Sequence, residues 1–417
     1  MDEFLDALEV RDPQARERDL LAALPTLLAQ AKTSAGWARI LADVNPQDVT
    51  SRETLARLPI TRKSDLAQLQ AMQLPFGGLN VTPTNRLRRI FMSPGAIFDP
   101  EGHGVDWWRC ARPMVAAGVR AQHIVQNCFS YHFTPAAAMV DGGAAKIGCA
   151  VIPAGTGQSE MQVQAMAALK PDVYAGTPSF LKIIIEKARE MGVDISSVQR
   201  AIVGAEALPP SLRKWLQDNG VPLVLQMYGS ADIGNIAYES ATNGAVNPGM
   251  ILDEELLLEI VRPGTGDPLP DGEIGEVVIT SFNPDYPLIR FATGDLSAVL
   301  PGVSPCGRTN TRIKGWLGRA DQTVKVRAMF VHPSQVAQVL QRYPMIVKAR
   351  LVVSGQMGQD AMTLHCEVEQ PDAVDGMAAA VVDSIRDVTK LRGEVRFVAR
   401  GSLPNDGKVI EDVRKYE

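Results

Sequence analysis

The order of apolar segments predicts an α/β protein with two domains: a large N-terminal domain with parallel sheets and a small barrel-like section, and a small mobile α+β C-terminal domain. Three observations lead to this prediction. The chain has 417 residues, whereas a single hydrophobic core stops growing at roughly 250–300 residues. Short apolar strands alternate with amphipathic helices from about residue 85 to 230. A βαββαβ order then follows residue 319.

Residues 1–45 are predicted to be helical and to serve packing. Leucines recur there at three- and four-residue spacing before a break at Asn45-Pro46: Leu20, Leu21, Leu24, Leu27 and Leu28. The alternation that follows predicts a largely parallel sheet covered by helices. Its expected strands are 124–129, 149–154, 172–176, 200–206 and 222–229, and its expected helices end at 145 or span 160–169, 178–191 and 209–219.

The predicted type of secondary structure changes after residue 250. Strands separated by tight turns are expected over 251–264, 270–282 and 286–295, as in a small barrel or a distorted sheet. The final segment predicts strands near 324–331, 346–355, 361–369 and 395–401 and helices over 333–342 and 372–390. We therefore expect a large domain over 1–318 and a small domain over 319–417, with the boundary near 319–322.

The composition favours a small-molecule enzyme. The chain is 46% hydrophobic and 21% charged, with a net charge of -5. No Lys/Arg block is present, so we expect no nucleic-acid partner and no membrane patch. Five scattered cysteines without a C-x-x-C spacing, together with the lack of a signal or membrane-spanning segment, favour a cytoplasmic location. The oligomeric state stays open, with a homodimer among the options.

Three predicted strands end in a glycine or small residue followed by an acid. They are Gly204-Ala205-Glu206, Tyr228-Gly229-Ser230-Ala231-Asp232 and Thr293-Gly294-Asp295. Ligands bind at the carboxyl ends of strands in open α/β sheets, so these segments are expected to line one pocket. Taken singly, each could equally be an ordinary turn with a solvated acid.

A longer series of motifs resembles phenylacetate-coenzyme A ligase and its relatives among the adenylate-forming enzymes. The resemblance runs from about residue 50 to the end of the chain. It includes GTPSFL at 176–181, VGAEALPPSLRKWL at 203–216, MYGSADIG at 227–234, YPLIRFATGD at 286–295, GRADQTVKVRAMFVHPSQV at 318–336 and GSLPNDGK at 401–408.

The resemblance implies an enzyme that activates a carboxylic acid with ATP and Mg²⁺ and passes it to coenzyme A. Asp232 replaces a family glutamate that binds the metal, and its shorter side chain changes the reach. Asp295 would hold the ribose hydroxyls, and Arg319 would reach the nucleotide. The other assigned residues are Gly204, Ala205 and Glu206 at adenine, and Tyr228, Gly229 and Ser230 beside the nucleotide and acyl group.

Two residues of the predicted small domain complete this assignment. Lys408 occupies the family's lysine position, where its ammonium would bridge the attacking carboxylate and the α-phosphate. Asp321 stands where such enzymes hinge between adenylation and thioester formation. Without the resemblance, Lys408 reads as a surface lysine near the end of the chain.

The phosphate loop departs from the family pattern. Relatives carry Ser, Thr, Gly and a lysine there, whereas this chain has FMSPGAIFDPEGHG at 91–104. Ser93 and Gly95 persist, but Pro94 lacks a backbone donor, and Asp99 and Glu101 would add negative charge near a triphosphate. Three interpretations follow: an enzyme with an altered loop, one that accepts a preformed adenylate, or a homologue that only binds nucleotide or acyl-CoA.

The acid and the acceptor are less constrained. Phe129, Tyr131 and His132 stand where the family's acid pocket begins, although the aromatic residues could equally be strand core and His132 a packed histidine. A phenylacetate-like aromatic acid is implied by the resemblance. An amine or a carrier-protein thiol could take the place of coenzyme A as acceptor.

Overall fold

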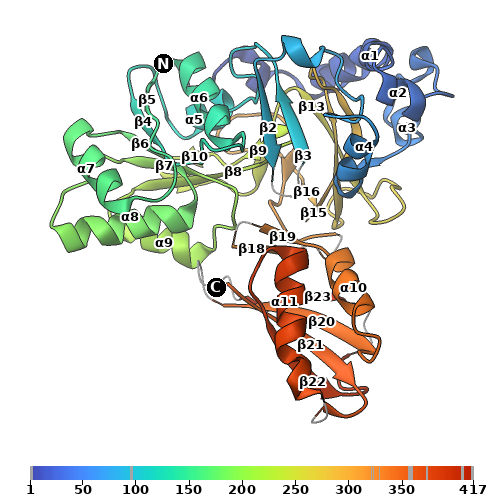
Figure 1. The fold of residues 1–417 in the computed structure, drawn as a ribbon. Helices are drawn as coiled ribbons and strands as arrows, with labels where there is room; N and C mark the ends of the chain where they lie inside the picture. Colours follow the sequence, from blue (N-terminus) through green and yellow to red (C-terminus); the bar gives the residue numbers. More distant parts are fainter. Residues whose placement is uncertain are drawn as a thin grey trace. The chain divides into compact units, whose positions relative to one another are not determined.

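The structure is a computed structural model that describes residues 3–93, 97–320, 322, 324–327, 329–355, 360–371, 374–404 and 408–414. The chain divides into two compact units, Met1–Gly318 and Arg319–Glu417 (Figure 1). Each unit has a hydrophobic core of its own, and each is described here by itself.

The large unit contains a nine-stranded sheet of strand order β16-β17-β12-β9-β8-β7-β6-β4-β5. Its parallel half confirms the predicted alternation of strands and helices. The strands of this half are β4 (Ile124–Asn127), β5 (Ala150–Ile152), β6 (Val173–Gly176), β7 (Arg200–Val203) and β8 (Leu223–Ser230). The helices around it are α5 (Ala111–Ala116), α6 (Ala136–Ile147), α7 (Ser159–Leu169), α8 (Pro178–Met191) and α9 (Pro210–Asp218).

Both faces of the parallel half are buried under helices, because successive side chains of a strand point to opposite faces. On one face Tyr174 and Val203 pack with α7, α8 and α9. On the other face Val173 and Ile202 pack with α5 and α6. Burial on both sides explains why these strands read as continuous apolar runs in the sequence.

Helix α8 shows how the local sequence sets an element. The Thr177 side chain accepts a hydrogen bond from the Phe180 N–H, Pro178 occupies the first turn, and Gly192 ends the helix with φ of 65°. Its buried residues recur at three- and four-residue spacing: Leu181, Ile184, Ile185 and Ala188. The N-terminus of this helix is thereby held beside the ends of β6 and β7.

The rest of the nine-stranded sheet is antiparallel. After strand β8 a tight turn returns the chain as β9 (Gly234–Tyr238), which pairs with β8 in the antiparallel sense. Gly234 has φ of 88°, a conformation that glycine adopts without strain. The remaining strands here are β12 (Met250–Leu252), β16 (Val299–Leu300) and β17 (Arg312–Ile313), with a separate β10 (Ala241–Thr242) and β11 (Ala245–Val246) pair.

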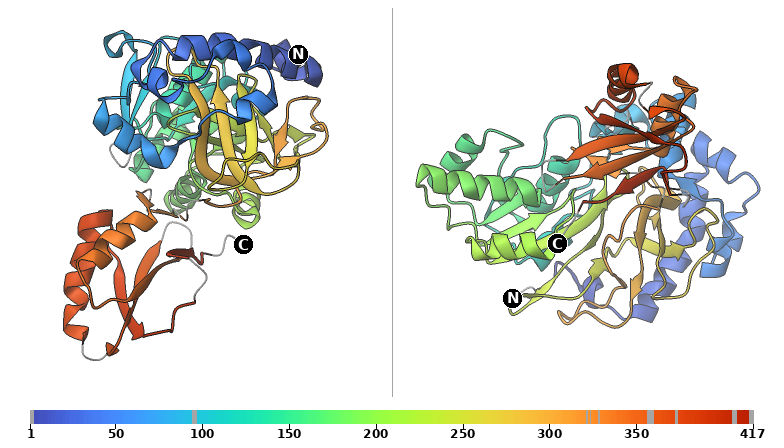
Figure 2. Two further views of the ribbon diagram at one scale, coloured as in Figure 1. Left: turned by 90° about the vertical axis from the view of Figure 1, so that its right-hand side faces the viewer. Right: turned by 90° about the horizontal axis from the view of Figure 1, so that it is seen from below.

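The hairpin-rich section forms a four-stranded sheet of order β1-β15-β14-β13. Its strands are β1 (Thr61–Arg62), β13 (Leu256–Val261), β14 (Gly275–Ser281) and β15 (Leu288–Ser297), with register shifts between β14 and β15. The N-terminal helices lie against it, as the blue and gold segments of Figure 2 show. They are α1 (Pro13–Ala31), α2 (Ala35–Ile40), α3 (Arg52–Ala56) and α4 (Leu66–Met72).

The chain also contains a short hairpin and several single-turn helices. A β2 (Arg89–Ser93) and β3 (Ile97–Glu101) hairpin carries the segment predicted to be the phosphate loop. Single-turn 3₁₀ helices occur at η1 (Ala7–Val10), η2 (Pro46–Asp48), η3 (Lys63–Asp65), η4 (Thr84–Arg86) and η6 (Asp375–Met377).

The small unit is an α+β sheet of order β22-β21-β20-β23, with a separate β18-β19 pair. Helix α11 begins at Ala378, later than predicted, and β23 was not predicted. The elements are β18 (Val324–Val326), β19 (Met329–Val331), α10 (Pro333–Gln341), β20 (Lys348–Ser354), β21 (Ala361–Val368), α11 (Ala378–Thr389), β22 (Glu394–Ala399) and β23 (Ile410–Asp412).

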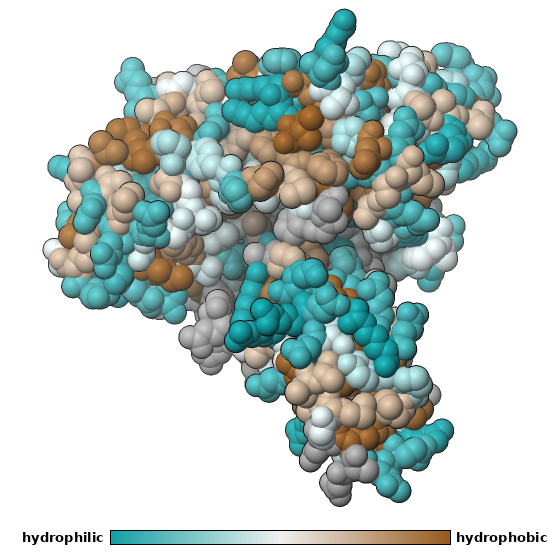
Figure 3. Space-filling model, viewed as in Figure 1, coloured by the Kyte–Doolittle hydropathy of each residue, from teal (hydrophilic) through white to brown (hydrophobic). Residues whose placement is uncertain are grey.

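The surface carries hydrophobic residues in small groups separated by polar ones on the face shown in Figure 3. Scattered groups of this kind are usual on folded domains. None of the helices in the described part of the chain has the length and apolar character that a bilayer crossing requires.

Candidate active site

Two predicted site residues, Tyr228 and Asp295, are brought together although they are 67 positions apart in the chain. The Tyr228 hydroxyl, on β8, donates to Asp295 Oδ2 at 2.8 Å. The Trp316 indole N–H donates to Asp295 Oδ1 at 3.0 Å. Each carboxylate oxygen thus accepts a hydrogen bond from a neutral donor, near the end of β15, which orients the Asp295 carboxylate.

Glu206 is held at the N-terminus of α8. Its Oε1 accepts hydrogen bonds from the Ser179 hydroxyl at 2.5 Å and from the Ser179 backbone N–H at 3.2 Å. The positive end of the helix dipole favours a carboxylate at this position. The carbonyl of Glu206 accepts from Gln226 Nε2 at 3.1 Å, which ties the segment after β7 to β8.

The glycines at these strand ends have packing reasons as well as the predicted role near a ligand. A Cβ on Gly229 would lie 2.4 Å from the Gly234 carbonyl oxygen, so only glycine fits the β8–β9 turn. A Cβ on Gly204 would meet Met227 atoms at 3.2 Å. Ala205 follows with φ of 66°. Ser230 ends β8, and its hydroxyl accepts from the Ile233 N–H at 3.3 Å.

Asp232, the predicted magnesium ligand, lies in the same turn and is paired with a cation. Its side chain is 0% exposed, and Oδ2 forms a short ion pair with the Lys63 ammonium. Although burial lowers the pKa of Lys63, the pKa is raised overall by Asp232, with Asp99 and Asp295 adding to the effect. Lys63 is therefore a positively charged member of the site that the motifs did not identify.

The β2–β3 hairpin turns its acids inward. Ser93 donates to Asp99 Oδ2 at 2.5 Å, and burial, with a contribution from Asp232, raises the pKa of Asp99 well above its usual value. Glu101 pairs with Arg89 at 3.1 Å. The Glu101 carboxylate is thus paired with a cation, and burial favours the protonated form of Asp99, so both acids add less negative charge than the sequence alone suggests. Gly95 lies outside the described residues.

The three residues expected in the acid pocket lie in different environments. Phe129 is 4% exposed within the core that covers β4, which favours the strand-core alternative. Tyr131 is 43% exposed, and its hydroxyl donates to Asp141 at 2.9 Å. His132 is exposed, with its ring 4.6 Å from that of Phe133.

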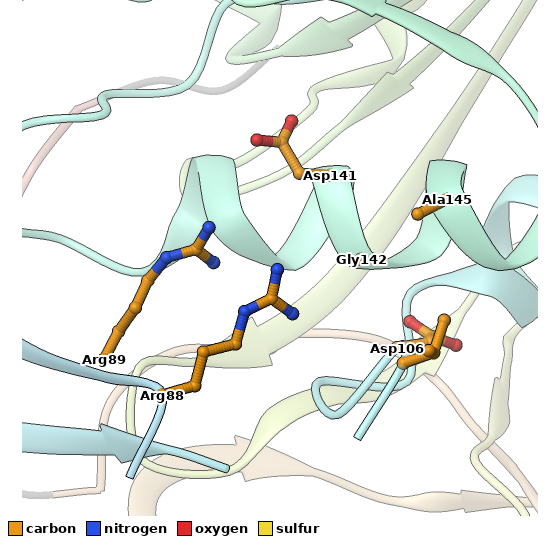
Figure 4. Close-up of a pocket in the computed structure, with 7 residues that line it drawn as sticks. Arg88, Arg89, Asp106, Asp141, Gly142 and Ala145 are labelled. Carbon is orange, nitrogen blue, oxygen red and sulfur yellow. The ribbon is translucent and has the colours of Figure 1, made fainter. Parts of the chain in front are cut away.

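A small cavity has Asp141 among its lining residues. Its volume is about 140 Å³, and its walls come from the start of β2, the segment before α5, and helix α6 (Figure 4). The guanidinium groups of Arg88 and Arg89 lie beside α6, whereas the Asp141 carboxylate lies on the opposite side of the helix. The lining residues are Arg88, Arg89, Val105, Asp106, Asp141, Gly142 and Ala145.

The remaining predicted residues belong to the small unit. Lys408 is exposed two residues before β23, which pairs with β20 through Ile410 and Leu351. The Arg319 guanidinium lies 5.8 Å from the centre of the Phe330 ring. Asp321, the predicted hinge, is outside the described residues.

The residues present fit a magnesium ion that is shared with a substrate. Asp232 Oδ1 is buried and has no hydrogen-bond partner among the described residues. No described group of three or more His, Cys, Asp or Glu side chains forms a protein-only metal cage. Mg²⁺ is commonly held by one or two carboxylates together with substrate phosphates, and Asp232 can supply one such oxygen.

Sequence reasoning missed Lys63, Ser179 and Trp316. Lys63 lies in the segment PITRKSDL, where a lysine between polar residues gives no local sign of burial. Ser179 and Trp316 act through acids that were identified, Glu206 and Asp295. A search for donors close to the predicted acids would have required the tertiary structure.

The site and the fold define the class of protein. Three strand ends of an α/β domain meet, with acids held in place by side-chain donors, and residues 111–283 match the family described as AMP-binding enzyme. This match lies within the large unit and makes that part of the chain similar to AMP-binding enzymes.

Relatives narrow this class. The chain is 31% identical to phenylacetate-coenzyme A ligase of Thermus thermophilus, covering 79% of this chain and 76% of the relative. It is 30% identical to the Escherichia coli enzyme of the same name, covering 88% and 86%. The chain belongs to the phenylacetate-coenzyme A ligase family, and the predicted activity class, AMP-forming acyl-CoA ligase, is confirmed.

A solved structure agrees on the fold. 2-Hydroxyisobutyryl-CoA ligase, in complex with 2-HIB-AMP and CoA, superposes with a TM-score of 0.82 over 98% of this chain and 92% of that one. The sequence identity is 22%, so the likeness supports the architecture alone.

Proposed function

We propose that this chain converts a ring-bearing carboxylic acid of the phenylacetate type into its coenzyme A thioester, with ATP as the energy source. The support for an aromatic acid is the name shared by its relatives, which are 30–31% identical phenylacetate-coenzyme A ligases. Tyr131 and Phe133, both exposed beside the start of α6, offer aromatic surface for a ring.

The reaction would proceed in two steps. The substrate carboxylate attacks the α-phosphorus of ATP, a new O–P bond forms, and the bond to pyrophosphate breaks. The coenzyme A thiolate then attacks the acyl carbon of the adenylate, and AMP leaves with the electrons of the broken C–O bond. Splitting the conversion through a mixed anhydride makes each step easier than direct thioester formation.

Residues of the large unit would bind and orient the nucleotide. Asp295, fixed by Tyr228 and Trp316, accepts hydrogen bonds from the ribose hydroxyls. The Gly204–Glu206 segment lies beside the adenine, and Asp232 supplies an oxygen to Mg²⁺. When bound, Mg²⁺ neutralises phosphate charge that would otherwise repel the incoming carboxylate. Lys408 of the small unit stabilises the charge that grows on the α-phosphate oxygens.

The observation that carries this proposal is the Tyr228–Asp295–Trp316 arrangement. Two neutral donors, at 2.8 and 3.0 Å, hold both oxygens of one carboxylate at a strand end. A carboxylate oriented in this way suits the paired hydroxyls of a ribose.

Pyrophosphate release tests the proposal. The protein is incubated with ATP, Mg²⁺ and a panel of aryl and alkyl acids, with and without coenzyme A, and thioester formation is followed separately. We expect release that depends on an aromatic acid and a thioester that requires coenzyme A. Added amines compete with coenzyme A in a parallel reaction. If thioester forms and no amide forms, an amine acceptor is excluded.

Calorimetry with AMP and with ATP can contradict the proposed ligase reaction. If calorimetry shows that AMP binds while ATP with Mg²⁺ does not, and no acid releases pyrophosphate, the chain binds nucleotide without adenylating an acid. The proposed ligase reaction would then be wrong.

A further inference from the structure

Lys63 lies where three segments of the large unit meet. Strand β1 pairs in parallel with β15, with Thr61 opposite Phe291 and Arg62 opposite Ala292, so η3 begins beside the middle of β15. From there the Lys63 ammonium reaches Asp232 in the β8–β9 turn. The carboxylate of Asp99, on β3, is also near enough to act on it electrostatically.

The ammonium of Lys63 keeps hydrogen-bonding capacity. A lysine has three N–H donors, and among the described residues the Lys63 ammonium donates one hydrogen bond, to Asp232 Oδ2. The Lys63 side chain is 23% exposed, whereas that of Asp232 is 0% exposed. Asp232 thus anchors the ammonium, and the partial exposure of the Lys63 side chain leaves room for its other N–H donors to turn to a ligand.

The adjacent hairpin has one cation, at its first residue, and that cation is paired with an acid. Residues 90–101 contain no Lys, Arg or His. Arg89, at the start of β2, is paired with Glu101 at 3.1 Å. A nucleotide triphosphate needs nearby positive charge, because Asp232 and Asp295 would otherwise repel it. Lys63 is the cation that the fold brings between these acids.

We propose that Lys63 binds oxygens of the β- and γ-phosphates of the nucleotide, with Asp232 holding its ammonium in place. Lys63 would provide, from the β1–η3 segment, the positive charge that residues 90–101 of the hairpin lack. This inference rests on the proposed function, because it requires ATP as a substrate.

Calorimetry with ATP and with AMP tests the role of Lys63. Replacing the ammonium by a thioether in Lys63→Met removes charge-assisted hydrogen bonds to phosphate, and we expect the Kd for ATP to rise about 10- to 100-fold. The Kd for AMP should stay within about threefold, since AMP lacks the β- and γ-phosphates. Lys214→Met is the matched control, because Lys214 pairs with Asp218 on the exposed face of α9.

A second comparison separates phosphate binding from support of Asp232. Lys63→Met leaves the buried Asp232 carboxylate unpaired, so the substitution is repeated in an Asp232→Asn background. We expect ATP affinity to fall again by about tenfold between Asp232→Asn and the double variant. If the second loss is below about threefold, Lys63 serves only as a counter-ion and the inference is wrong.

The remaining outcomes are also decisive. Equal losses of ATP and AMP affinity in Lys63→Met would indicate a structural role and overturn the inference, as would unchanged ATP affinity. Wild-type pyrophosphate release reports separately on the proposed function. If the wild-type protein adenylates an acid and Lys63→Met binds ATP as tightly as the wild type, the role of Lys63 is refuted. The ligase assignment then remains intact.

Discussion

The buried carboxylate of Asp106 makes the stability of the large unit depend on pH. Its carboxylate oxygens accept hydrogen bonds from the Cys110 N–H at 2.6 Å and the Ala111 N–H at 3.0 Å, ahead of α5. Burial, with a smaller contribution from Asp253, nevertheless raises the pKa of Asp106 from 3.8 to about 7. The backbone donors and Arg109 oppose this shift without cancelling it.

The raised pKa of Asp106 predicts the sign of a pH effect. Between pH 4 and 7 the folded state holds a proton that the unfolded state has lost, so the contribution to stability is present at low pH and is lost as the pH rises. The slope contributed by one proton is at most roughly 1.4 kcal/mol per pH unit. Asp106→Asn should flatten the fall in the free energy of unfolding between pH 4 and 7.

Denaturant melts at several pH values measure this slope. Asparagine also tolerates the positive φ of 58° at position 106, so the backbone is preserved. Asp43→Asn, at an exposed turn, is the control and should retain the wild-type slope. Identical slopes for wild type and Asp106→Asn would show that Asp106 does not titrate in this range.

The β8–β9 hairpin is the element that places Tyr228 and Asp232. A methyl group at position 229 would lie 2.4 Å from the Gly234 carbonyl oxygen, so the two strands would have to separate. Overpacking of this kind costs roughly 1–3 kcal/mol. Gly229→Ala should therefore lower the melting temperature and weaken ATP binding by shifting the turn that carries Asp232.

A second glycine gives the control for the hairpin prediction. Gly376, in η6 of the small unit, has no atom within 4 Å of an added Cβ, so Gly376→Ala should leave ATP binding unchanged. Thermal melts and calorimetry measure both effects. If Gly229→Ala binds ATP as tightly as the wild type, the turn tolerates the displacement and its geometry is not critical.

The order of elements was accessible from the sequence, whereas their pairing was only partly so. Strands β6 and β7 are buried on both faces, so they appear in the sequence as continuous apolar runs. The three- and four-residue spacing of apolar residues in α8 indicates its buried face. Strands β9 and β23 were not predicted, because short strands next to turns carry weak periodicity. Likewise, α11 begins at Ala378 and not at 372, since boundaries depend on capping and packing.

The residues proposed to take part in the reaction belong to both units of the molecule. Lys408 lies in the small unit, whereas Tyr228, Asp232 and Asp295 lie in the large one. Strand β23 anchors the segment after Lys408, because the Leu351 N–H donates to the Val409 carbonyl at 2.9 Å. We therefore expect a substitution at Lys408 to affect catalysis and to spare nucleotide binding by the large unit.

Lys408→Ala should lower the rate of adenylation on the order of 100-fold or more, the scale for removing a positioned electrostatic contact. The Kd for AMP should remain within about threefold of the wild type, since AMP lacks the developing charge. Arg386→Ala removes another exposed cation of the same unit, on α11, and is the control. Pyrophosphate release at full activity in Lys408→Ala would remove Lys408 from the reaction.

The sequence by itself determined the α/β class, the alternation of strands and helices, and the family, because periodicity and motif spacing are local properties of a chain. The tertiary structure decided which side chains meet. Lys63 and Asp232 are 169 positions apart and Tyr228 and Asp295 are 67 apart. Pairs at such separations form only where strand pairing brings distant segments together, and no local pattern records them.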